Sequence, residues 1–76
     1  MAKTKFEPAR EGDELLILGL GMWGRGATFA DAKKQYPFTL KAPYHVFSVH
    51  PDTFVNDWGS MVHPRGHDPL KLATVE

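Results

Sequence analysis

Two stretches of the chain are apolar enough to form buried strands. Residues Leu15–Leu20 are aliphatic apart from one glycine, and such a short run is typical of a strand that is buried on both faces. Residues 44–50 are rich in aromatic and β-branched side chains and lie between Pro43 and Pro51, which predicts a second strand. We expect the first of these strands to be the central one.

A short helix is predicted to follow Thr28. Thr28 and Asp31 resemble a capping box, with a hydroxyl at the N-cap and a carboxylate three residues later. Apolar residues recur at helical spacing from Phe29 to Tyr36, and Pro37 ends the pattern after about two turns. So short a helix is unstable alone in water, so its apolar face must rest on a sheet. The centre of the core is predicted to include Leu16, Ile17, Leu18, Phe29, Val46 and Phe47.

The remaining segments predict connections and one hairpin. Residues 21–26 contain three glycines, which favours a loop or a bulged strand end. Residues 53–55 and 60–62 flank Asn56-Asp57-Trp58-Gly59, a four-residue connection with turn formers first and glycine last, which predicts a hairpin. Two prolines lie in the tail at 64–76, so we expect it to run extended over the surface.

These elements predict an α+β fold. We expect a three- or four-stranded, mostly antiparallel sheet with one short helix on one face, in the order strand, helix, strand, strand. Residues 15–63 would form this single domain. Half of residues 1–14 are charged, and this segment has one proline and a single large apolar residue, Phe6, which predicts a flexible N-terminal arm. Residues 64–76 form the extended C-terminal tail.

Composition narrows the class of protein. The chain has 76 residues and no cysteine, so neither disulfides nor cysteine-bound zinc can stabilise it. It has no apolar run long enough to span a membrane and its first residues lack the apolar stretch of a signal peptide, so a cytoplasmic location is expected. Nine basic and nine acidic residues give zero net charge, which removes the strongest argument for nucleic-acid binding.

Residues 19–24 match the dinucleotide-binding pattern G-x-G-x-x-G, but their surroundings do not fit it. In that pattern the third glycine lies at the start of the helix that holds the pyrophosphate, whereas the predicted cap here is Thr28, four residues later. An acidic residue is also required about 20 residues further on, where Lys41 and Ala42 stand. We therefore expect no cofactor.

The four histidines suggest at most a weak metal site. His45 and His50 are five residues apart in one predicted strand, so their side chains point to opposite faces. His63, His67 and Asp68 have the spacing of a weak surface site, but no cysteine completes a tetrahedral set. The favoured interpretation is two histidine–proline corners without metal.

Catalysis is not expected either. The serines, Ser48 and Ser60, both lie within predicted strands, whereas a serine nucleophile is usually exposed at a strained turn. A domain of this size also offers little volume for a substrate pocket.

The residues that most favour a binding role are Trp23, Arg25, Trp58 and Arg65. Trp23 and Arg25 lie between glycines, and exposed tryptophan and arginine are enriched at the energetic centres of protein interfaces. Alternatively, Trp23 covers the edge of a small core. A second alternative is a nucleic-acid module, in which bases stack on the two tryptophans beside basic side chains.

Residues 24–32, Gly-Arg-Gly-Ala-Thr-Phe-Ala-Asp-Ala, resemble the G-x-G-D-T-x-x-E-A segment of HicB-like antitoxin domains. The chain departs from that pattern at Ala27, where the family usually has an acidic residue, and it has no appended DNA-binding motif. The resemblance implies a partner-binding βαββ fold without catalysis. In general character the chain also resembles small orphan proteins of tailed bacteriophages, many of which bind a host protein. We therefore expect a non-catalytic domain that binds another protein, such as a host protein in the host cytoplasm, and a homo-oligomer is a further possibility.

Overall fold

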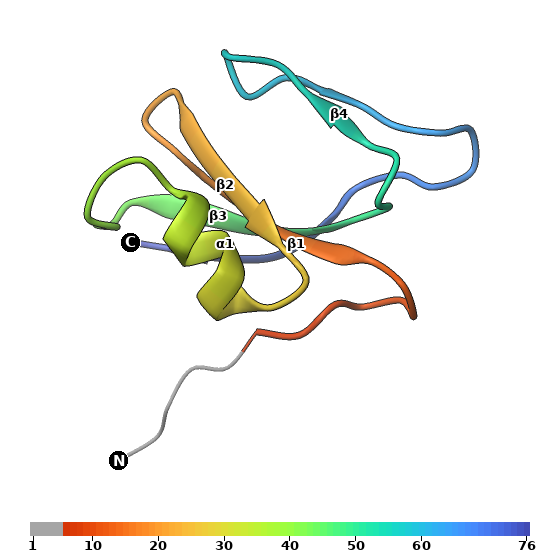
Figure 1. The fold of residues 1–76 in the computed structure, drawn as a ribbon, viewed down its shortest axis with the longest axis horizontal. Coiled ribbons are helices and arrows are strands. Elements are labelled where there is room, and N and C mark those ends of the chain that lie inside the picture. Colours follow the sequence, from red (N-terminus) through yellow and green to blue (C-terminus); the bar gives the residue numbers. More distant parts are fainter. Residues whose placement is uncertain (1–5) are drawn as a thin grey trace.

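The computed structural model describes residues 6–76, and a four-stranded antiparallel sheet lies at its centre (Figure 1). The order of strands in this sheet is β2-β1-β3-β6, and β4 pairs with β5 in a separate small hairpin. The elements of the described chain are β1 (Glu14–Gly19), β2 (Met22–Gly26), α1 (Phe29–Gln35), β3 (Tyr44–Val49), β4 (Phe54–Val55), β5 (Met61–Val62) and β6 (Leu70–Val75). The predicted α+β class is confirmed, and the predicted succession of strand, helix and strands is present with β2 and β6 added.

One face of the sheet packs against α1. Leu15 and Ile17 of β1 point to this face, where they form a fully buried cluster with Val46 of β3 and Ala32 of α1. The alternation along β1 sends Leu16 to the other face. Both faces of β1 are therefore buried, as its continuous apolar sequence predicted.

The small β4–β5 hairpin covers the other face. Leu16, Val49 and Val55 form its buried cluster, and Trp23, Phe47 and Met61 pack around them. The molecule therefore has three layers, with α1 on one side of the sheet and the hairpin on the other. The sheet face opposite the helix is therefore not open to a partner, because the hairpin folds back onto it.

The helix begins where the sequence predicts. Thr28 is its N-cap, and the Thr28 Oγ1 accepts a hydrogen bond of 3.1 Å from the backbone N–H of Asp31. The helix packs so closely on β2 that a Cβ at Gly24 would overlap the carbonyl oxygen of Ala32. Residues 22–26 thus form a regular strand, where the sequence predicted a loop or a bulged strand end. The glycines disfavour a strand by propensity, but their lack of side chains allows the helix to pack closely on β2.

The predicted core is partly correct. Leu16, Ile17 and Val46 are fully buried, whereas the other three predicted residues, Leu18, Phe29 and Phe47, are only half-buried. Phe29 is the first residue of α1, and its ring packs beside that of Phe6, with the two ring centroids 5.0 Å apart.

The C-terminal tail adds an edge strand that the sequence did not predict. Residues 70–75 pair with β3 from Tyr44↔Val75 to Ser48↔Leu70, and a β-bulge between Val46 and Phe47 interrupts the register. The two prolines that favoured an irregular tail both precede this strand.

Part of the predicted N-terminal arm packs on the domain. The Ala9 N–H donates a hydrogen bond of 2.9 Å to Ser48 Oγ, and Arg10 donates one of 2.7 Å to the carbonyl of Asp68. Residues 1–5 of that arm lie outside the described residues. Within residues 6–76, no helix has the length and apolar character needed to cross a membrane.

Candidate functional site

Trp23 lies on β2 and faces the β4–β5 hairpin. It is half-buried against the cluster around Leu16, and its indole Nε1–H donates a hydrogen bond of 2.8 Å to the carbonyl of Asn56. The ring therefore fastens the turn of the hairpin to the sheet. This placement matches the alternative in which Trp23 covers the edge of the core.

Arg25 points to the same face and is fully engaged within the chain. Its guanidinium forms an ion pair of 2.8 Å with Glu14 and donates hydrogen bonds to the carbonyls of Thr53 and Pro51. Only 19% of the side chain is exposed. Arg25 thus holds the connection between β3 and β4 against β2, and little of its charge is left for a partner.

Trp58, in contrast, projects into solvent from an ordered turn. It is 82% exposed. The Asn56 side-chain oxygen accepts hydrogen bonds from the N–H groups of Trp58 and Ser60, at 2.9 and 3.0 Å. The next residue, Gly59, has φ +84°, and a Cβ there would lie 2.5 Å from Leu18 Cδ1, so the turn sits tightly on the sheet.

Two further apolar side chains are exposed around the same end of the sheet. Leu20, in the two-residue turn between β1 and β2, is 83% exposed, and Phe38, just after α1, is 62% exposed. Leu20 lines one shallow hollow together with Trp58 and a second one together with Phe38. We call Leu20, Phe38 and Trp58 the apolar tip. The three loops that carry them lie at one end of the molecule in Figure 1.

Sequence reasoning missed two members of the tip. Leu20 was assigned to the buried strand, but β1 ends one residue earlier and Leu20 begins the turn. Phe38 follows the proline that ends the helix, and no periodic pattern includes it. A large apolar residue next to a turn-forming glycine or proline was the available signal in both cases.

Arg65 lies apart from the other predicted residues. It is exposed in the connection between β5 and β6, in a turn that the hydrogen bond from His67 N–H to the Pro64 carbonyl closes at 3.0 Å. In Figure 1 this blue connection is on the opposite side of the molecule from the β1–β2 turn. The structure therefore brings Trp23, Arg25 and Trp58 to one side of the sheet but does not bring Arg65 to them.

The histidines are divided between different neighbours. The rings of His50 and His67 pack with centroids 4.4 Å apart. His63 Nδ1 instead lies 3.4 Å from a carboxylate oxygen of Asp68. Across residues 6–76, no three His, Cys, Asp or Glu side chains come together in a way that could hold a metal ion.

A buried polar network ties the N-terminal segment to β3. Ser48 Oγ donates a hydrogen bond of 2.8 Å to Asp13, and the Arg10 guanidinium forms an ion pair of 2.9 Å with the same carboxylate oxygen. Burial by itself would raise the pKa of Asp13, but the hydrogen bonds from Ser48 and Arg10 and the charge of Arg10 outweigh it and lower that pKa. Ser48, one of the two serines considered as a nucleophile, is fully buried in this network and has a structural role.

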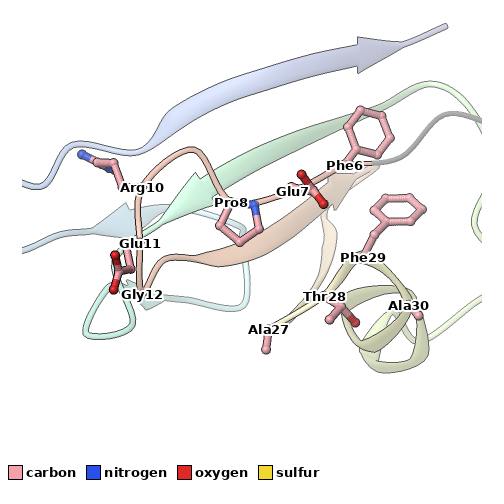
Figure 2. A pocket seen from close by; sticks show the side chains of 10 residues that line it. All are labelled: Phe6, Glu7, Pro8, Arg10, Glu11, Gly12, Ala27, Thr28, Phe29 and Ala30. Carbon is pink, nitrogen blue, oxygen red and sulfur yellow. The ribbon is translucent and has the colours of Figure 1, made fainter.

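A hollow of about 740 Å³ opens between the N-terminal segment and the start of α1. Figure 2 shows Phe6 and Phe29 close together on one side, whereas Arg10 and Glu11 lie far from them. The charged side chains that line this hollow do not converge on one point, whereas binding of a small polar ligand would require them to do so.

Comparison of the chain with protein-family models, with curated proteins and with solved structures finds no match. The resemblance of residues 24–32 to HicB-like domains therefore stays a prediction.

Proposed function

We propose that this chain is a non-catalytic domain that binds another protein through its apolar tip. The observation that carries the proposal is the exposure of three large apolar side chains at one end of the sheet, at 83% for Leu20, 62% for Phe38 and 82% for Trp58. Single exposed apolar residues are common, but a group of them on adjoining loops marks an interaction surface.

The way Trp58 is held supports this role. Its turn is fixed by the Asn56 side chain and by the indole of Trp23, so the exposed ring is presented on a rigid support. A turn whose backbone is already ordered loses less conformational entropy when a partner covers it. Tryptophan is also among the residues that contribute most to protein interfaces.

The charges favour a protein partner over nucleic acid. The guanidinium groups of Arg10 and Arg25 are already paired with Asp13 and Glu14. The whole chain has a net charge of zero. Because phosphate binding depends on free cations and weakens steeply with salt, we expect partner binding to change little between about 50 and 200 mM salt.

The test compares tip variants with a matched surface variant. A partner is first captured from the native host with the full chain, and its affinity is then measured by calorimetry. Trp58→Ser and Leu20→Ser should each weaken binding at least about tenfold, or ~1.4 kcal/mol, without changing the melting temperature. The control is Phe54→Ser, since Phe54 is 63% exposed but lies on the outer face of the β4–β5 hairpin.

Equal losses in the tip variants and in Phe54→Ser would contradict the proposal, as would tip variants that bind normally. Binding that collapses between 50 and 200 mM salt would instead favour the nucleic-acid alternative. The more specific prediction, a phage-encoded chain that modulates a host protein, is tested by the identity of the captured partner.

A further inference from the structure

Among the described residues, no strand pairs with the outer edge of β6 along its six residues, Leu70–Val75. In Figure 2 this pale violet strand lies at the top of the sheet beyond β3. An edge strand leaves its outward N–H and C=O groups without partners in the sheet. Leu72, Ala73 and Val75 are half-buried in this strand.

The register of the sheet shows how the inner strands direct their backbone groups. β1 and β2 are joined by a two-residue turn, so the flanking pair Gly19↔Met22 exchanges hydrogen bonds. From there, successive residues of β1 direct their backbone N–H and C=O groups alternately towards β2 and towards β3. Those of Leu16 therefore point towards β3. Its partner Phe47 therefore directs its own groups back towards β1.

The same alternation identifies the outward residues of β6. In β3, Tyr44 and Val46 must turn towards β6, where they oppose Val75 and Ala73. Thr74 lies between these two inward residues, so its N–H and C=O point away from the sheet. Lys71 opposes Phe47, which is engaged with β1, so the backbone groups of Lys71 also point outward.

This edge is complementary to a second copy of itself. Two β6 strands can be placed antiparallel about a two-fold axis that passes between their Thr74 residues. The bulged residues of each copy, Leu72 and Ala73, then lie opposite Val75 of the other copy. The next position places Lys71 of each copy opposite Glu76 of the other. An edge lysine normally discourages strand pairing, but here each one meets an opposite charge.

We propose that two copies of this chain pair through β6 to form one continuous eight-stranded antiparallel sheet. The two β6 strands would form two contacts between Lys71 of one copy and Glu76 of the other. On the sheet face that carries α1, their apolar side chains would form a continuous strip. The opposite edge, β2, is less suited to such pairing, because Gly24 and Gly26 offer no side chains for cross-strand contact. The proposal uses no residue of the apolar tip, so it stands or fails independently of partner binding.

Sedimentation equilibrium of the full chain provides the first test. The wild-type chain should show a reversible monomer–dimer equilibrium, and Thr74→Pro should raise the dimer dissociation constant at least tenfold. Proline removes the outward N–H, so the pairing of β6 with β3 should survive, and circular dichroism should show a folded monomer. Thr74→Val is the control for the hydroxyl, which lies 3.0 Å from His45 Nδ1, and it should still form dimers.

A charge exchange provides the second test and changes only exposed side chains. Lys71→Glu and Glu76→Lys should each weaken the dimer several-fold, because like charges then face each other across the axis. The double variant K71E/E76K should restore wild-type dimerisation, since the two contacts are re-formed with reversed polarity. A chain that stays monomeric at millimolar concentration would overturn the proposal. A dimer that is insensitive to Thr74→Pro, or that the double variant fails to restore, would overturn it equally.

Discussion

Arg25 shows how a residue that suggests binding in the sequence can serve the fold. Its planar guanidinium presents several donors in a fixed geometry, which suits a site where a carboxylate and several carbonyls converge. Glu14, Pro51 and Thr53 supply such a site at the β3–β4 connection. The glycines on either side made Arg25 look like a loop residue, although they lie under α1 while Arg25 points the other way.

We expect Arg25→Met to lower the free energy of unfolding by about 2 kcal/mol, because part-buried carbonyls and the Glu14 carboxylate lose their donor. Arg25→Lys should recover little of this loss, since an ammonium group cannot reach the same set of acceptors. Urea unfolding measures both. Arg65→Met is the control and should change stability by less than about 0.5 kcal/mol, because Arg65 is exposed. Equal effects of Arg25→Met and Arg65→Met would contradict this role.

Asp13 makes stability depend on acid pH. Its pKa is lowered in the folded chain from a reference value of 3.8. A carboxylate with a lowered pKa stabilises the fold above its unfolded pKa, and this contribution is lost as pH falls through the folded value. Asp13→Asn should therefore be less stable than wild type at pH 7, and the difference should shrink below about pH 4.

Unfolding curves of both proteins between pH 7 and 2.5 measure this difference. The exposed Asp57→Asn variant is the control and should follow the wild type throughout. A gap between Asp13→Asn and wild type that stays constant down to pH 2.5 would show that charge is not the cause.

Among the elements, those with a local signal could be predicted from the sequence. Thr28 and Pro37 bound the helix, and residues 56–59 carry the turn chemistry of the hairpin. The element β2 could not be predicted in the same way, because Gly24 and Gly26 disfavour a strand by propensity. What makes them a strand is the close approach of α1, a contact between elements that no local pattern reveals.

The edge strand β6 was missed for another reason. The bulge places Leu72 and Ala73 on the same side of the sheet, so the alternation expected of a half-exposed strand is broken within six residues. The apolar tip was predicted only at Trp58. Leu20 and Phe38 lie in loops, and their exposure depends on how far α1 and the hairpin reach across the sheet.

The helix cap gives a prediction at the scale of one element. Thr28→Ala should lower the free energy of unfolding by about 1 kcal/mol, because the backbone N–H of Asp31 loses its acceptor. Chemical denaturation measures the change. Thr39→Ala, at an exposed position after the helix, should leave the midpoint unchanged. An unchanged midpoint for Thr28→Ala would mean that the cap contributes nothing.

At the scale of the whole molecule, the apolar tip follows from the shortness of the covering layers. A helix of seven residues lies on one face of the sheet, and a hairpin of two-residue strands lies on the other. A chain of 76 residues buries a smaller fraction of its surface than a larger domain does. The end of the sheet where β1 turns into β2 is left uncovered, and that is where Leu20 and Trp58 project.

Pairing through β6 would place two apolar tips on one assembly. A partner with two copies of the recognised surface would then bind its second site as an intramolecular event, and avidity would exceed the affinity of one tip. The dimer variants described above separate these contributions, because Thr74→Pro should remove the avidity while leaving the binding of a single tip intact.

The packing of α1 on β2 also bears on the order in which the chain folds. β1, β2 and α1 follow one another within residues 14–35, and only a two-residue turn and a two-residue link separate them. Closing such short loops costs little chain entropy, whereas β3 and β6 must join the sheet from much further along the sequence. We therefore expect the segment from Glu14 to Gln35 to form the folding nucleus, so that disturbing the Thr28 cap should slow folding more than it speeds unfolding.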